Sequence, residues 1–183
     1  MKRKSAVLLL SLVAVAFTAF AADKNPMVGG QPMYPNKDIV DNAVKSADHT
    51  TLVAAVKAAG LVDTLKGPGP FTVFAPTNEA FAKLPAGTVD TLLKPENKDM
   101  LTKILTYHVV AGRLSAADLK KQIQAGHGQA TLKTVSGGAL IAMMQGSKIV
   151  LKDEKGGMST VTIPNVFQSN GVIHVVDTVV MPN

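Results

Sequence analysis

Three residues near the C-terminus, Ser169, His174 and Asp177, are of the types that form a nucleophilic triad for hydrolysis. The run from Val172 to Met181 carries two of them and is rich in valine, which predicts a strand. Because side chains alternate between the two faces of a strand, His174 and Asp177 would point in opposite directions. We therefore expect each of them to hydrogen-bond locally, and the chain also lacks G-x-S-x-G, H-E-x-x-H, P-loop and G-x-G-x-x-G motifs. No enzymatic activity is predicted.

Metal binding has little support in the residue types. Cys is absent, which removes thiolate ligands. The histidines are scattered without ligand spacing, at positions His49, His108, His127 and His174. A soft ion such as Cu(I) could bind methionine, although core filling is the ordinary role of this residue; the candidates are Met27, Met33, Met143, Met144 and Met158. We predict no cofactor.

The candidate partner-binding residues are Tyr107, His108, Val109 and Val110. His108 continues a helical stripe formed by Leu101, Ile104 and Leu105, which predicts an imidazole in the core or at its rim. The alternative is a contact patch in which the Tyr107 tip reaches the surface beside the two valines. Both interpretations remain open at this point.

Helices are predicted mainly in the first two thirds of the chain. An apolar stripe over 39–47 predicts a helix capped by Asn36, and a second helix follows Thr50. Further helices are expected after Thr77, at Thr88–Leu93, at Pro95–Tyr107 and from a Ser115 cap. Between them, Phe71–Ala75 is short, apolar and bounded by prolines, which predicts a buried strand.

From Ala130 onward the pattern changes to strands separated by glycines. The expected strands are Thr131–Val135, Ala139–Met143, Lys148–Lys152, Ser159–Ile163 and Val172–Met181. The last is apolar on both faces, so it should be central in its sheet. Helices followed by a meander of strands indicate an α+β domain.

The N-terminus resembles an export signal. Lys2, Arg3 and Lys4 precede an uncharged, largely apolar stretch that ends at Ala19-Phe20-Ala21, a small-x-small cleavage pattern. We predict a signal peptide over residues 1–21 and an irregular lead-in over 22–36. Signal removal would halve the formal charge of +6 and leave no membrane span, so a secreted or periplasmic protein is expected.

Three segments together resemble one family, the fasciclin (FAS1) domains. Phe71 to Phe81, with the sequence FTVFAPTNEAF, is similar to the first signature of the family, and Asn170 to Pro182, NGVIHVVDTVVMP, to the second. Tyr107-His108-Val109-Val110 lies between them and is similar to the Tyr-His segment of the family. The resemblance covers about residues 37–182, which are identified as a FAS1 domain.

The resemblance implies an α+β fold, a β-wedge or sandwich with helices packed on it. It also implies a secreted module for adhesion, acting by non-covalent contact with a protein, a cell surface or extracellular matrix. In animal members the Tyr-His region has been linked to integrin binding, which is what points to Tyr107 and its neighbours as partner-binding residues.

Other partners fit the composition less well. The chain has no Trp and few aromatic residues, so a stacking platform for nucleic acid or sugar is not expected. An exported binding protein for a small apolar ligand or a metal ion remains the alternative function. Such a ligand would lie between the sheet and the helices.

Overall fold

The computed structural model describes residues 25–183, so the predicted signal peptide lies outside the described part of the chain. The helices are α1 (Ile39–Ala43), α2 (Thr50–Ala58), α3 (Val62–Lys66), α4 (Asn78–Ala82), α5 (Thr88–Leu92), α6 (Lys98–Tyr107) and α7 (Ala116–Ala125), with 3-10 turns η1 (Ala47–His49) and η2 (Pro95–Asn97). The strands are β1 (Met27–Val28), β2 (Gln31–Pro32), β3 (Phe71–Pro76), β4 (Val109–Ala111), β5 (Gln129–Lys133), β6 (Ala139–Gln145), β7 (Lys148–Lys152), β8 (Met158–Gln168) and β9 (Gly171–Val176).

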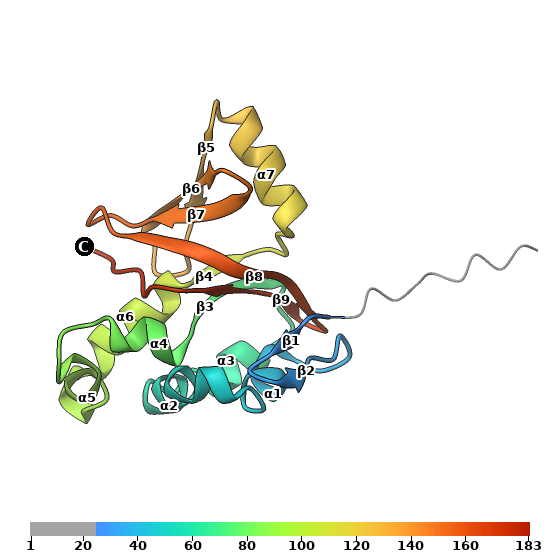
Figure 1. The fold of residues 1–183 in the computed structure, drawn as a ribbon. Helices are drawn as coiled ribbons and strands as arrows, with labels where there is room; N and C mark the ends of the chain where they lie inside the picture. The colour runs from blue at the N-terminus through green and yellow to red at the C-terminus, as the bar shows by residue number, and fades with distance from the viewer. Residues whose placement is uncertain (1–24) are drawn as a thin grey trace, which may run out of the picture.

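The main sheet has seven strands in the order β4-β3-β9-β8-β7-β6-β5. Strands β5 to β9 form an antiparallel meander, whereas β9 pairs in parallel with β3. An isolated bridge between Val110 and Thr134 brings the β4 edge next to β5, so the sheet curls toward closure. Helices α1 to α3 lie below this sheet in Figure 1, and α7 lies beside β5 and β6. The predicted α+β class is confirmed.

The paired strands β3 and β9 separate two apolar cores. Val73 and Ile173 face one core, which contains the buried aliphatic side chains of α1, α2 and α6. Phe74 and Val176 face the other, which is closed by α7 and strands β5 to β7. This division follows from the alternation of side chains along a strand that is covered on both faces. The central position predicted for the last strand is confirmed, since every residue of β9 is buried.

Helix caps account for where several helices begin. Thr77 caps α4 through its hydroxyl, and Ser115 forms a reciprocal capping box with Asp118 at the start of α7, as predicted. The cap predicted at Asn36 is wrong. Asp38 takes that role instead, because its carboxylate accepts the backbone N–H of Asp41 at 2.8 Å.

Other elements also differ from the predictions. The lead-in contains the β1–β2 hairpin. Strand β9 ends at Val176, because the Asp177 carboxylate accepts the N–H of Thr160 at 2.8 Å and the chain then leaves the ladder. Strand β4 directly follows α6 and was not predicted, since three residues are too short to show a pattern.

Gly171 explains why β9 can begin against β3. A side-chain carbon at this position would lie 2.1 Å from the carbonyl oxygen of Phe71. Only glycine allows the two backbones to approach this closely. The Asn170-Gly171 pair of the second signature therefore fixes the start of the parallel pairing.

Candidate functional site

Tyr107 is the last residue of α6 and is completely buried. Its hydroxyl donates to the carbonyl of Ala139 at 2.6 Å and accepts the backbone N–H of Glu154 at 3.2 Å. Burial raises the pKa of the phenol to about 12. The ring also lies against Gly138, where an added side-chain carbon would meet it at 2.8 Å. Of the two open alternatives, the one in which the Tyr107 tip reaches the surface does not match the structure, because the buried phenol joins α6 to β6 and to the turn after β7.

His108 is the C-cap residue of α6, and it lies in the protein interior with an exposed fraction of 2%. Its Nε2 accepts the backbone N–H of Val180 at 3.2 Å, so the proton is on Nδ1, which donates to the carbonyl of Ile104 at 2.8 Å. Burial lowers the pKa of the imidazole to about 4, and the ring is neutral at pH 7. The core interpretation of His108 is confirmed.

Val109 and Val110 lie in β4 with exposed fractions of 6% and 5%. They belong to different cores, because Val109 faces the helices and Val110 faces α7 and strands β5 to β7. The structure therefore does not bring the four predicted residues together as a surface patch. A role of these four residues in partner binding stays a prediction. Because they are buried, they would affect binding by stabilising the fold and not by touching the partner.

His174 lies at the centre of β9 and is fully buried. Its Nδ1 accepts the N–H of Asn165 at 3.2 Å, so Nε2 carries the proton and donates to the carbonyl of Leu114 at 2.7 Å. Its ring stacks on Phe74 at 5.7 Å between centroids. Both nitrogens are thus occupied by backbone groups, and burial lowers the pKa of the ring.

Ser169, His174 and Asp177 are not assembled into a triad. Ser169 is exposed, and the Asp177 carboxylate is engaged by Thr160 and by the hydroxyl of Thr178 at 3.0 Å. The prediction that His174 and Asp177 each hydrogen-bond locally is confirmed. Within residues 25–183 no group of three or more His, Asp or Glu side chains is arranged to hold a metal ion.

Asn170 was named above only as the first residue of the second signature, but its buried side chain fixes two helices to the sheet. The amide oxygen accepts the N–H of Ile39 at 3.1 Å, at the start of α1. The amide nitrogen donates to the carbonyls of Leu65 and Gly67 at 2.7 and 2.9 Å, at the end of α3. An Asn before a strand gives no sequence signal for such distant contacts.

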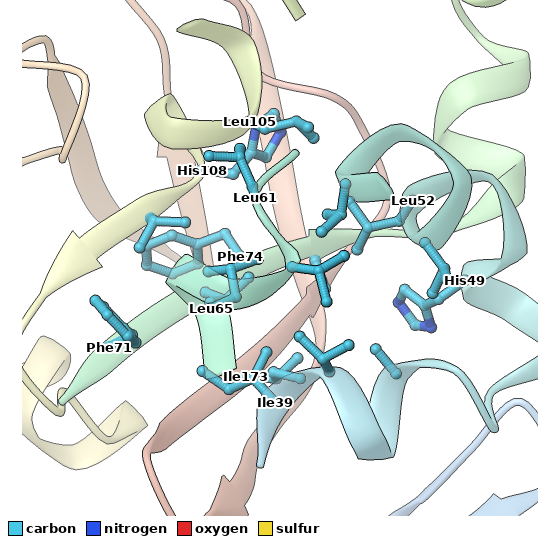
Figure 2. Close-up of a pocket in the computed structure, with 18 of the residues that line it drawn as sticks. Ile39, His49, Leu52, Leu61, Leu65, Phe71, Phe74, Leu105, His108 and Ile173 are labelled. Carbon is cyan, nitrogen blue, oxygen red and sulfur yellow. The ribbon is translucent and has the colours of Figure 1, made fainter. Parts of the chain in front are cut away.

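A cavity of about 80 Å³ lies between these helices and the sheet. Figure 2 shows Ile39, Leu52, Leu65 and Ile173 around the space, with Phe71 and His49 at opposite ends of the view. His49 is buried, its Nδ1 hydrogen-bonds the hydroxyl of Ser46 at 2.8 Å, and burial lowers its pKa. The lining of the cavity is mostly apolar, and its polar members are Ser46, His49, Lys57, Thr64, Thr106 and His108. Sequence patterns identified its walls as core but could not show that space remains between them.

The motif histidines hydrogen-bond to backbone groups, and so they hold the secondary structure together. A family model described as Fasciclin domain matches residues 47–182. The chain belongs to the fasciclin domain family.

Relatives support this membership. Protein sll1483 of Synechocystis sp. is 51% identical over 144 residues, which cover 79% of this chain and 73% of the relative. Immunogenic protein MPB70 of Mycobacterium bovis is 39% identical over 76% of this chain and 66% of its own length. Cell surface glycolipoprotein MPB83 of Mycobacterium bovis is 43% identical over 67% of this chain and 48% of its own length.

A solved structure shows the same fold. The FAS1 domain pair of the insect cell adhesion molecule Fasciclin I superposes with a TM-score of 0.70 at 20% identity, over 79% of this chain and 50% of that chain. None of the helices in residues 25–183 has the length and hydropathy needed to cross a membrane.

Proposed function

We propose that this protein is a secreted interaction module that binds a protein, a cell surface or extracellular matrix by non-covalent contact. Membership of the fasciclin family, across residues 47–182, is the observation that carries the proposal. Related proteins named as a cell surface glycolipoprotein and as a cell adhesion molecule support it. The predicted signal peptide, residues 1–21, supports export to the periplasm or the medium.

The N-terminal part of the described chain offers a contact surface, which we call the Tyr34 surface: Met27, Tyr34 and Val44. These side chains are 56%, 44% and 49% exposed. The Asn42 amide hydrogen-bonds both the N–H and the carbonyl of Tyr34, at 3.0 and 2.8 Å, and so fixes this segment to α1. Lys45 lies over the tyrosine ring, 5.5 Å from its centroid. An exposed tyrosine that is anchored through its backbone is a suitable binding hot spot.

The paired change Tyr34→Ser and Val44→Ser is expected to weaken partner binding by about tenfold or more, since hot-spot side chains carry most of the affinity of an interface. Binding of the mature protein to immobilised matrix proteins and to whole cells measures this. Met100→Ser is the matched control, because Met100 is 58% exposed on α6, away from the Tyr34 surface. Equal loss in the control would contradict this location, and no binding by the unmodified protein would contradict the function.

Tyr107, His108, Val109 and Val110 enter this proposal as supports of the fold. They hold α6 and β4 in place, so a change at any of them alters partner binding through the scaffold.

The cavity between α1–α3 and the sheet favours a second function, an exported carrier of a small apolar ligand. Its walls are apolar, as in most small-molecule sites. Native mass spectrometry of protein purified from its source is expected to show a retained small molecule. A single mass equal to that of the mature chain alone would contradict this second function.

A further inference from the structure

The side chains of β5 to β8 alternate between two faces of the meander, and one of these faces joins a core. Leu132, Leu140 and Leu151 point to the face that α7 covers, and they belong to the core that α7 closes. The apolar side chains of the opposite face belong to neither of the two cores. We call this opposite face the lysine face, and its members are Lys133, Ile141, Met143, Lys148, Lys152 and Met158.

Strand register brings the members of the lysine face side by side. Lys152 lies opposite Ile141 of β6 and opposite Met158 of β8. Met143 follows on the same face of β6, opposite the buried Val150. Met158 is 46% exposed, and Ile141 and Met143 are half-buried. Because directly opposed side chains in a sheet start only about 4.5–5.5 Å apart, the apolar and cationic groups form one continuous surface.

The charge of the lysine face is positive. Its three lysines are exposed, and within residues 25–183 none of them has a carboxylate partner within 4.0 Å. The carboxylates of Asp153 and Glu154, in the turn after β7, accept backbone N–H groups. The carboxylate of Asp177, at the border with β9, accepts the N–H of Thr160. The lysines are therefore available to an anionic partner, whereas a second copy of the same face would repel them.

The residue types of the lysine face favour a lipid surface over a protein. Its apolar members are an isoleucine and two methionines, and it contains no Tyr, Trp or Arg, the residues that anchor most protein interfaces. Lysine is a flexible point charge, which suits a diffuse layer of phosphates better than the fixed, bidentate recognition that arginine provides. Aliphatic side chains beside lysines can enter the headgroup region of a bilayer while the ammonium groups stay in water.

We propose that the lysine face binds the surface of a bilayer that contains anionic phospholipids. This inference rests on the proposed contact with cell surfaces and names the chemistry of one such contact. It uses a different surface from the Tyr34 surface, since β6 and β7 lie at the end of the molecule remote from β1, β2 and α1 (Figure 1). The lipid phosphates attract the lysines, and burial of Met158 among the headgroups adds apolar stabilisation.

Sedimentation of the mature protein with lipid vesicles tests the charge of the face. We expect binding to vesicles of phosphatidylcholine with about 30% phosphatidylglycerol, and binding about tenfold weaker or less to phosphatidylcholine alone. The paired change Lys148→Gln and Lys152→Gln should weaken binding by about tenfold or more, because each lysine near an anionic surface contributes about fivefold. The matched control is Lys120→Gln with Lys121→Gln, which removes the same charge from exposed positions of α7, on the covered side of the sheet, and should change binding less than about twofold.

A second pair of variants tests the apolar part of the face. Met158→Ser should weaken binding to the anionic vesicles by about threefold to tenfold, because it removes apolar area that the headgroup region would bury. Met100→Ser, at an exposed position of α6, is the matched control and should leave binding unchanged. Raising NaCl from about 0.1 M to about 0.5 M should also weaken binding, since salt screens the lysines.

Equal binding to both kinds of vesicle, or an equal loss in the Lys120 and Lys121 control, would overturn the proposal. Binding of soluble poly-L-glutamate without binding of the anionic vesicles would show that the face takes an acidic polypeptide, and the lipid assignment would be wrong. The vesicles contain no protein, so a failure to bind them leaves the Tyr34 surface and the proposed function intact. The variant with Tyr34→Ser and Val44→Ser should bind the anionic vesicles as the parent does.

Discussion

Replacing Tyr107 by alanine is expected to lower the free energy of unfolding by about 3–5 kcal/mol, the usual cost of removing a large buried aromatic side chain. The change removes a completely buried ring from the core closed by α7. It also leaves the carbonyl of Ala139 and the N–H of Glu154 without their hydrogen-bond partner. Urea denaturation followed by far-ultraviolet circular dichroism measures the effect, since the chain has no Trp for fluorescence.

Tyr107→Phe is the matched variant, because it keeps the ring and removes only the hydroxyl. We expect a loss of about 1–3 kcal/mol, the cost of leaving buried polar groups unpaired. A Tyr107→Ala variant as stable as the parent would show that the phenol is not part of the core. The comparison of the two variants matters for function. If Tyr107→Ala unfolds the protein, a loss of partner binding does not show that Tyr107 touches the partner.

Acidification from pH 7.5 to pH 4.5 is expected to lower the free energy of unfolding by about 2–3 kcal/mol through His108 alone. Its pKa is about 4 in the folded protein and 6.5 ordinarily, and burial is the main cause. Between these values the unfolded chain binds the proton and the folded chain does not, so stability falls as pH falls. The contribution is complete above about pH 6.5 and is lost progressively toward pH 4. The hydrogen bond to the Ile104 carbonyl and the charge of Asp153 raise the pKa of His108, but burial has the larger effect.

His49 and His174 act in the same direction, because burial lowers the pKa of each. The control is His108→Gln, which carries no titrating ring and should show a shallower dependence on pH than the parent. Urea midpoints at both pH values measure the difference. Parallel curves for parent and variant would contradict a neutral, buried His108.

Sequence patterns were sufficient for elements that are long or capped locally. The helix from Ser115 follows from capping chemistry, and the strand Lys148–Lys152 follows from a short run of apolar, β-branched residues. Strand β4 and the β1–β2 hairpin were missed because two or three residues carry no period. The FAS1 resemblance supplied the overall fold, which the structural neighbour confirms.

The site was less predictable than the fold. His108 was correctly placed on the apolar face of its helix, but the burial of Tyr107 depends on Gly138 and on the turn at Glu154, far along the chain. The cavity depends on imperfect packing between α1–α3 and the sheet, and Asn170 positions those helices through contacts with Ile39 and Leu65. Such long-range geometry is absent from local patterns.

The parallel pairing of β3 with β9 has a consequence for biosynthesis. Phe71 pairs with Gly171, so β3 waits for a partner strand that is synthesised about 100 residues later. Neither core can close before β9 has left the ribosome, because β9 forms a wall of both. A nascent chain of this kind stays open until β9 emerges, and its apolar segments are exposed to aggregation during that interval.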